Sequence, residues 1–321
     1  MRPRYILTLL FSLPLFISVG QVEPGPYDPR VLVHQPEAYS LFGKPLYRME
    51  LPAETKAQLD SQYASAKTNY DENPNNADNI IWFGRRAAYL WRYREAIGIF
   101  SEGINKFPND PRLYRHRGHR YITIREFDKA IADLETAASL ISDREDEIEP
   151  DGQPNRYNIP TSTLHSNIWY HLGLAYYLQN DLKNAVRSYR ECMKFSSNPD
   201  MLCATSDWLY MTLKRLGNAQ EARNVLAPIT NDMQIIENYS YHRRLLMYKG
   251  ELQPDSLLNT QQASELDIAT QGYGVGNWYL YNGMGEQANK IFEKVIAGNY
   301  WAAFGYIAAE ADLKRMESTK K

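Results

Sequence analysis

The sequence has little of the material that marks disulfide-stapled, nucleic-acid-binding or polytopic membrane proteins. Its 321 residues hold only two cysteines, and 36 basic residues against 38 acidic residues give a formal net charge of −2. Two cysteines are too few for a disulfide scaffold, and a nearly neutral chain gives no electrostatic reason to bind nucleic acid. After residue 20 no segment reaches the ~20 consecutive apolar residues of a membrane-spanning helix. We therefore expect no nucleic-acid partner and no transmembrane segment once an N-terminal leader has been cleaved.

Recognisable catalytic and metal-binding motifs are also lacking. The sequence contains no nucleophile elbow, phosphate-binding loop, HExxH pair or paired-carboxylate motif. The stretch Glu147–Gly152 only faintly matches a calcium-binding loop, because Pro150 interrupts it and Asn158 stands at the closing position. His116 and His119 lie one helical turn apart, but no carboxylate accompanies them on that face. We predict that the protein is not an enzyme and that it holds neither a metal nor a cofactor.

The first 20 residues are typical of a secretory signal peptide. Arg2 and Arg4 provide a positive start, Tyr5–Val19 form an apolar run of 15 residues, and Ser18–Gly20 place small residues at a cleavage site. The run is too short to span a bilayer as a helix, which favours cleavage over retention as an anchor. No cysteine follows it, so no lipid anchor is predicted there. We expect an exported chain, periplasmic or secreted and associated with the cell envelope.

A regular spacing of small residues is the strongest positive signal. A glycine is followed twelve residues later by an alanine four times, as Gly84 and Ala96, Gly118 and Ala130, Gly173 and Ala185, and Gly276 and Ala288. Glycine within a helix costs roughly 1 kcal/mol relative to alanine, so its repeated use there requires a packing reason. We infer that it allows two antiparallel helices, joined by a short turn, to approach closely.

The frame around these pairs resembles the tetratricopeptide repeat (TPR), a helix-turn-helix unit of about 34 residues. It is most complete at Trp169, Leu172, Gly173 and Tyr176, followed by Ala185 and Tyr189. The resemblance implies an all-α fold, an α-α superhelix (TPR solenoid) of about six helix pairs with a C-terminal capping helix. It also implies a scaffold that acts by binding its partners.

Composition divides the chain around this repeat domain. Residues 21–52 hold six prolines and no sustained periodicity, which predicts an extended arm. The repeat domain is expected over residues 53–316, with an acidic insertion over 141–160, a last helix over Tyr300–Met316 and a tail at 317–321. The last third of the chain, with Tyr248 and Gly250 before a short helix, resembles the NlpI-like envelope TPR adaptors. That resemblance implies an adaptor for envelope proteases and hydrolases.

The repeat frame also predicts which side chains face a concave groove. These are Arg85, Tyr89, Arg115, His119, Tyr170, Tyr177, Asp207, Lys214, Asn277 and Tyr281. An aromatic and basic groove suits an extended peptide or a partner helix that carries acids, and the alternative is a solvated groove without a dedicated ligand. Some TPR domains grip C-terminal carboxylates with a clamp of Lys, Asn and Arg. That clamp is not predicted here, because Asn277 and Arg115 belong to different repeats.

Basic residues are concentrated over residues 85–125, where nine arginines and one lysine stand against three acids, and the acidic insertion follows directly. One interpretation is that residues 141–160 fold over these repeats and neutralise them, since a tethered opposite charge has a high effective concentration. The other is an exposed surface, including Arg85, Arg112 and Arg115, that binds an anionic polysaccharide.

Taken together, the sequence predicts an exported TPR adaptor that binds a protein or peptide partner through its groove without catalysis. The first alternative is an accessory protein that binds anionic glycan through residues 85–125. The second is an enzyme subunit that is active only within a complex.

The two cysteines flank a turn between helices. Cys192 lies near the end of one predicted helix and Cys203 near the start of the next, so the two face each other across an antiparallel pair. In an oxidising compartment they can form a disulfide. The alternative is a pair of small buried thiols that serve packing.

Overall fold

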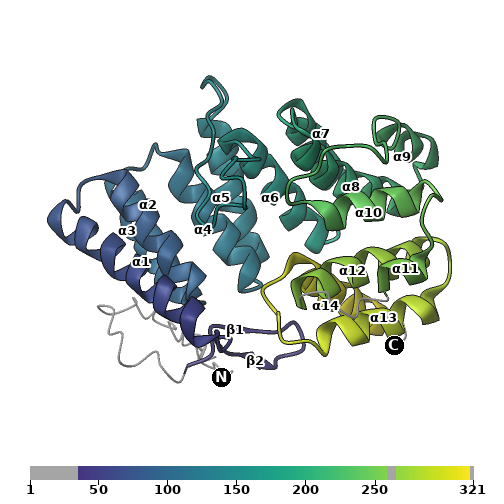
Figure 1. The fold of residues 1–321 in the computed structure, drawn as a ribbon, viewed down its shortest axis with the longest axis horizontal. Coiled ribbons are helices and arrows are strands. Elements are labelled where there is room, and N and C mark those ends of the chain that lie inside the picture. The colour runs from purple at the N-terminus through teal and green to yellow at the C-terminus, as the bar shows by residue number, and fades with distance from the viewer. Residues whose placement is uncertain (1–34, 259–264, 319–321) are drawn as a thin grey trace, which may run out of the picture. The chain divides into compact units, whose positions relative to one another are not determined.

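The computed structural model describes residues 35–258 and 265–318, and their regular secondary structure is almost entirely helical. They form fourteen α-helices and one two-stranded antiparallel sheet. Neighbouring helices in the sequence pack side by side, from α1 at the purple end of the colour scale to α14 at the yellow end (Figure 1). The all-α fold predicted from the repeat frame is confirmed. Within the described ranges no helix has the length and apolarity needed to cross a bilayer.

Five antiparallel helix pairs make up most of the fold. They are α2 (Ala77–Tyr89) with α3 (Tyr93–Lys106), α4 (Pro111–Thr123) with α5 (Phe127–Leu140), α6 (Leu164–Leu178) with α7 (Leu182–Lys194), α8 (Pro199–Arg215) with α9 (Ala219–Val225), and α12 (Glu265–Tyr281) with α13 (Gly285–Ile296). The others are α1 (Ala53–Glu72), the short helices α10 (Tyr239–Tyr248) and α11 (Pro254–Leu258), and α14 (Phe304–Ser318). Asn76 and Asp110 cap α2 and α4 by accepting backbone N–H groups, which explains where these helices begin.

The glycines of the repeat frame make room for the side chain sixteen residues later. A Cβ atom on Gly173 would lie 2.7 Å from the ring of Tyr189, and one on Gly118 would lie 2.8 Å from Leu134. The same relation joins Gly84 to Phe100 and Gly276 to Phe292. The alanines of the frame, Ala96, Ala130, Ala185 and Ala288, are fully enclosed, and Trp169 is partly buried. The packing reason inferred from the spacing is therefore confirmed.

Each turn inside a pair contains one residue in the left-handed region of backbone conformation. The last two pairs use glycine there, at Gly217 and Gly283, and the third pair uses Asn180. Gly250 takes the same conformation between α10 and α11. The first two pairs use Trp91 and Arg125, with φ of 59° and 69°. A side chain in this region costs roughly 1–2 kcal/mol. Both side chains are buried and contact Trp301, just before α14, and these contacts offset the strain.

The described part of the predicted arm, residues 35–52, contains a hairpin over residues 38–46, where an extended segment was expected. Strand β1 (Ala38–Tyr39) pairs with β2 (Pro45–Leu46) in antiparallel register. The backbone N–H of Leu41 donates to the Glu310 carboxylate of α14 at 2.7 Å, and the Trp301 indole N–H donates to the Tyr47 carbonyl oxygen at 2.7 Å. The residues that the hairpin contacts lie more than 250 positions later in the sequence. No local sequence pattern predicts such contacts.

The hairpin and the turns at Trp91 and Arg125 thus contact Trp301 and α14. We call this group of contacts the terminal clasp. Glu310 also forms a buried ion pair with Arg125 at 2.9 Å, and the Trp301 ring packs edge-on against Trp91 at 5.3 Å between centroids. Because residues 301–303 turn to place the Trp301 ring there, α14 begins at Phe304, four residues later than predicted.

Candidate partner-binding cleft

The side chains predicted to line an open groove are not exposed. Arg85, Arg115, Tyr170, Tyr177 and Asn277 are buried, and Tyr89, His119, Lys214 and Tyr281 are partly buried. Asp207, predicted with them, is fully enclosed. The open groove was therefore a wrong prediction, because other parts of the same chain cover these positions.

In the second half of the fold the cover consists of helices. The Tyr170 hydroxyl of α6 donates to the Tyr241 hydroxyl of α10 at 3.1 Å, and the Tyr177 hydroxyl lies 2.6 Å from that of Tyr273 in α12. Asn277 is 0% exposed. These positions form the interior between helices and offer no surface to a partner.

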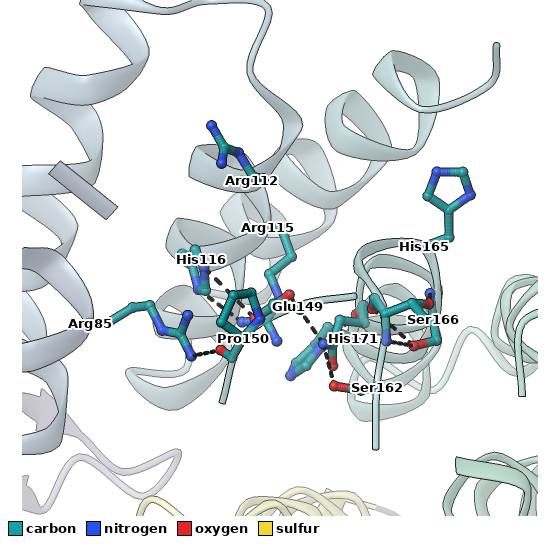
Figure 2. A network of polar contacts seen from close by, with 12 residues as sticks. Arg85, Arg112, Arg115, His116, Glu149, Pro150, Ser162, His165, Ser166 and His171 are labelled. Atoms are coloured by element: carbon teal, nitrogen blue, oxygen red, sulfur yellow. Dashed lines mark hydrogen bonds and ion pairs between the residues drawn. The ribbon is translucent and has the colours of Figure 1, made fainter. Parts of the chain in front are cut away.

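In the first half the cover is the acidic insertion. A guanidinium nitrogen of Arg85 donates to the Pro150 carbonyl oxygen at 2.7 Å, and Arg86 donates to the Gly152 carbonyl oxygen at 2.7 Å. Arg115 forms an ion pair with Glu149 at 3.0 Å. Figure 2 shows Arg85 of α2 and Arg115 of α4 directed at the insertion. The interpretation that the insertion folds over the arginine-rich repeats is confirmed.

The Glu149 carboxylate is gripped from two repeats. Arg115 of α4 pairs with it, and His116 Nε2 lies 3.8 Å away (Figure 2). The Asn167 side-chain amide of α6 also donates to it at 3.1 Å. Arg115 and an asparagine thus hold a carboxylate together, but the asparagine is Asn167 and not Asn277, which was considered for a carboxylate clamp in the sequence analysis. Sequence reasoning missed Asn167, although it lies two residues before Trp169 in the first turn of the best repeat.

A cleft of about 260 Å³ remains beside the insertion, and we call it the Arg cleft. Arg85, Tyr89, Arg115, Arg120, Glu149, Asp151 and Glu237 are among its lining residues. The Arg120 guanidinium makes no ion pair or hydrogen bond with the described residues and lies 5.5 Å from the Tyr93 ring centroid. Burial lowers the pKa of Arg120 to about 10, so this arginine is still charged at neutral pH. Arg120 is therefore a charged side chain without an anionic partner among the described residues.

Three histidines lie next to this cleft without forming a metal site. The His116 ring stacks on Phe100 at 5.5 Å between centroids, whereas the His119 ring packs against His171 at 4.3 Å. Burial, followed by the nearby Arg115, lowers the pKa of His116 and His171 well below its usual value. Among the residues described, no group of three or more potential ligands is placed to hold a metal ion.

Cys192 and Cys203 are buried free thiols in the structure. The Sγ of Cys192 lies 3.3 Å from the Ser166 carbonyl oxygen and 3.2 Å from Thr205 Oγ1, so it is engaged as a weak hydrogen-bonding group. Burial raises the pKa of each thiol to about 12. Neither thiol is therefore ionised near neutral pH.

We expect a maleimide to label neither thiol in the folded chain and both thiols after denaturation without reductant, because burial and not oxidation protects them. Intact mass spectrometry counts the labels directly. A denatured, unreduced chain that takes up no label would instead reveal a disulfide between Cys192 and Cys203.

Comparison with known proteins identifies one of the helix pairs directly. The tetratricopeptide repeat family matches residues 166–199, which cover most of α6, all of α7 and the start of α8. The chain therefore contains a tetratricopeptide repeat. The matched segment is the one whose frame is most complete in the sequence, and it contributes Asn167 to the grip on Glu149.

The individual proteins to which the chain is similar are distant. BBSome complex member BBS4 of Bos taurus is 26% identical over 141 residues, which are 44% of this chain and 23% of the bovine protein, so the chain spans about a quarter of that relative. A TPR protein from Parabacteroides merdae aligns with a TM-score of 0.48 and 16% identity over 81% of this chain and 93% of its own. YrrB, described as a TPR protein with an unusual peptide-binding site, aligns with a TM-score of 0.40 and 15% identity over 80% of this chain and 98% of its own.

Proposed function

We propose that this TPR protein is an exported scaffold that binds a protein partner at the Arg cleft and performs no covalent chemistry. One observation carries the proposal: Arg85, Arg86 and Arg115 already hold an extended peptide segment through two backbone carbonyl oxygens and one carboxylate. Backbone carbonyls are common to every peptide, so the same donors suit a segment from another protein.

Export is supported by the sequence of the first 20 residues, which lie outside the described part of the structure. A positive start, a 15-residue apolar run and small residues at a cleavage site are the features of a secretory signal. The resemblance to NlpI-like adaptors remains a prediction and would place the protein in the cell envelope. An adaptor there would bring its partner to a second envelope protein.

The contacts favour a protein partner over an anionic glycan. Most arginines of the 85–125 region are already paired, as Arg112 is with Asp78 and Asp110, Arg117 with Asp133, and Arg125 with Glu310. A long polyanion needs a row of free cations, whereas a peptide needs only a few donors at one place. The Arg cleft fits the second requirement.

Site-specific photocross-linking in the source cells tests the proposal. A benzophenone side chain at Gln153, an exposed residue at the rim of the Arg cleft, should give a discrete adduct with one protein, found in the envelope or periplasmic fraction. The control places the same group at Lys183, an exposed residue of α7. Equal adducts at both positions, adducts at neither, or adducts confined to the cytoplasmic fraction would contradict the proposal.

A further inference from the structure

The segment that lines one side of the Arg cleft is bound as a ligand would be, by polar contacts from three different helices. Arg85 and Arg86 come from α2, Arg115 from α4 and Asn167 from α6. We propose that residues 147–153 are a tethered competitor, and that the partner is recognised through an extended acidic peptide whose carboxylate replaces that of Glu149. This inference rests on the proposed function of the Arg cleft and names both its ligand and its regulation.

The segment can leave the cleft without disturbing the hydrophobic core. Ile148 is 66% exposed, and Glu147 and Pro150 are exposed as well. Among residues 147–153 only Gly152 is buried. The segment is therefore held by hydrogen bonds, including backbone bonds to residues 162–164, and by one ion pair. A second acidic peptide can offer the same kinds of group to the arginines.

The tethered segment is also an imperfect ligand. The Asp151 oxygen Oδ2 is buried and has no hydrogen-bond partner among the described residues. Burial, followed by repulsion from Glu237, raises the pKa of Asp151 above its usual value. At the same time Arg120, which lines the same cleft, has no anionic partner among the described residues. A peptide that directs its second acid to Arg120 instead of Glu237 would satisfy both groups.

One position in the cleft restricts the ligand to a small residue. Gly152 lies so close to the Tyr89 ring that a Cβ atom on it would overlap the tyrosine hydroxyl. In this chain Gly152 directly follows Glu149, Pro150 and Asp151. The pattern that fits is thus an acid, any residue, a second acid, and then glycine.

Tethering sets how strongly the segment competes. A segment linked within the same chain acts at an effective concentration of the order of millimolar. If the segment itself binds the free cleft with a Kd of roughly 10–100 μM, it weakens the apparent affinity of an added peptide by about 10–100-fold. Loss of the segment's two acids should remove most of this factor.

The test uses a fluorescent peptide with the sequence of residues 145–153 and the purified full chain. The double variant Glu149→Gln and Asp151→Asn should bind the peptide at least about tenfold more tightly than the unaltered chain. The control variant, Asp143→Asn and Glu145→Gln, removes two charges from exposed positions that do not line the Arg cleft, and it should bind like the unaltered chain. Adding Arg115→Glu to the first variant should abolish binding. Equal affinity in all chains, or binding insensitive to Arg115→Glu, overturns the inference.

A second measurement needs no substitution. Arg156 lies in the exposed part of the insertion, and saturating peptide should displace the segment and speed tryptic cleavage at Arg156 several-fold in the unaltered chain. A peptide with glutamine at the position of Glu149 should have little effect. An unchanged cleavage rate overturns the tethered competitor. If cross-linking at Gln153 still captures a protein, the scaffold function stands while this inference fails.

Discussion

Acidification from pH 6.5 to pH 5 should lower the free energy of unfolding by about 4 kcal/mol. His116, His119 and His171 are held neutral in the folded chain, because burial and then nearby arginines or histidines lower their pKa values well below 6.5. In the unfolded chain each takes up a proton near pH 6.5. The unfolded state then binds more protons than the folded state, so stability is complete above pH 6.5 and is lost as the pH falls.

One buried group acts in the opposite direction. Burial raises the pKa of Asp207 to about 6, although Arg244 lies against it and favours its charged form. Below that pH the folded state gains one proton there, which offsets one of the three histidines. A net difference of about two protons corresponds to about 2.7 kcal/mol for each pH unit.

Urea denaturation at a series of pH values measures this slope. The double variant His116→Gln and His171→Gln should flatten the profile by about two protons, because glutamine does not titrate. An unfolding free energy that stays constant between pH 7 and pH 5 would show that the histidines reach solvent.

Replacing Gly173 with leucine should cost about 3 kcal/mol or more of stability. A Cβ atom there would lie 2.7 Å from the Tyr189 ring, and Tyr189 is itself fully buried, so neither side chain has room to move. Inserting carbon atoms into a filled core forces the two helices apart. Thermal and urea denaturation would measure the loss.

Gly98 provides the matched control for this substitution. It also lies within a helix, α3, but no atom outside its own turn lies within 4 Å of its Cβ position. Gly98→Leu should therefore stabilise the chain by up to about 1 kcal/mol through the usual helix preference. A Gly173→Leu chain as stable as the parent would mean that the repeat glycines have no packing role.

The repeat architecture was predictable because its cause is local. Small residues at fixed separations, such as Gly173 and Ala185, report directly on how closely two consecutive helices approach. The charge difference between residues 85–125 and the insertion was equally visible, and it correctly predicted that one covers the other. Both signals lie within a few dozen residues of sequence.

The errors concern contacts between distant parts of the chain. Tyr177 and Asn277 stand at groove positions of their own repeats, yet contacts with distant helices enclose them. No repeat frame contains that information. Asn167 was missed for a related reason: its partner Glu149 belongs to the insertion, which has no place in the repeat pattern.

Repeat proteins commonly unravel from their outermost units, since those units touch only one neighbour. Here Glu310 binds both Leu41 and Arg125, and Trp301 binds both Tyr47 and Trp91. The hairpin and the turns of the first two helix pairs are therefore joined to the segment that leads into α14, so unravelling from the C-terminal end must break these contacts. We therefore expect the repeats of this chain to fold and unfold together in one cooperative transition.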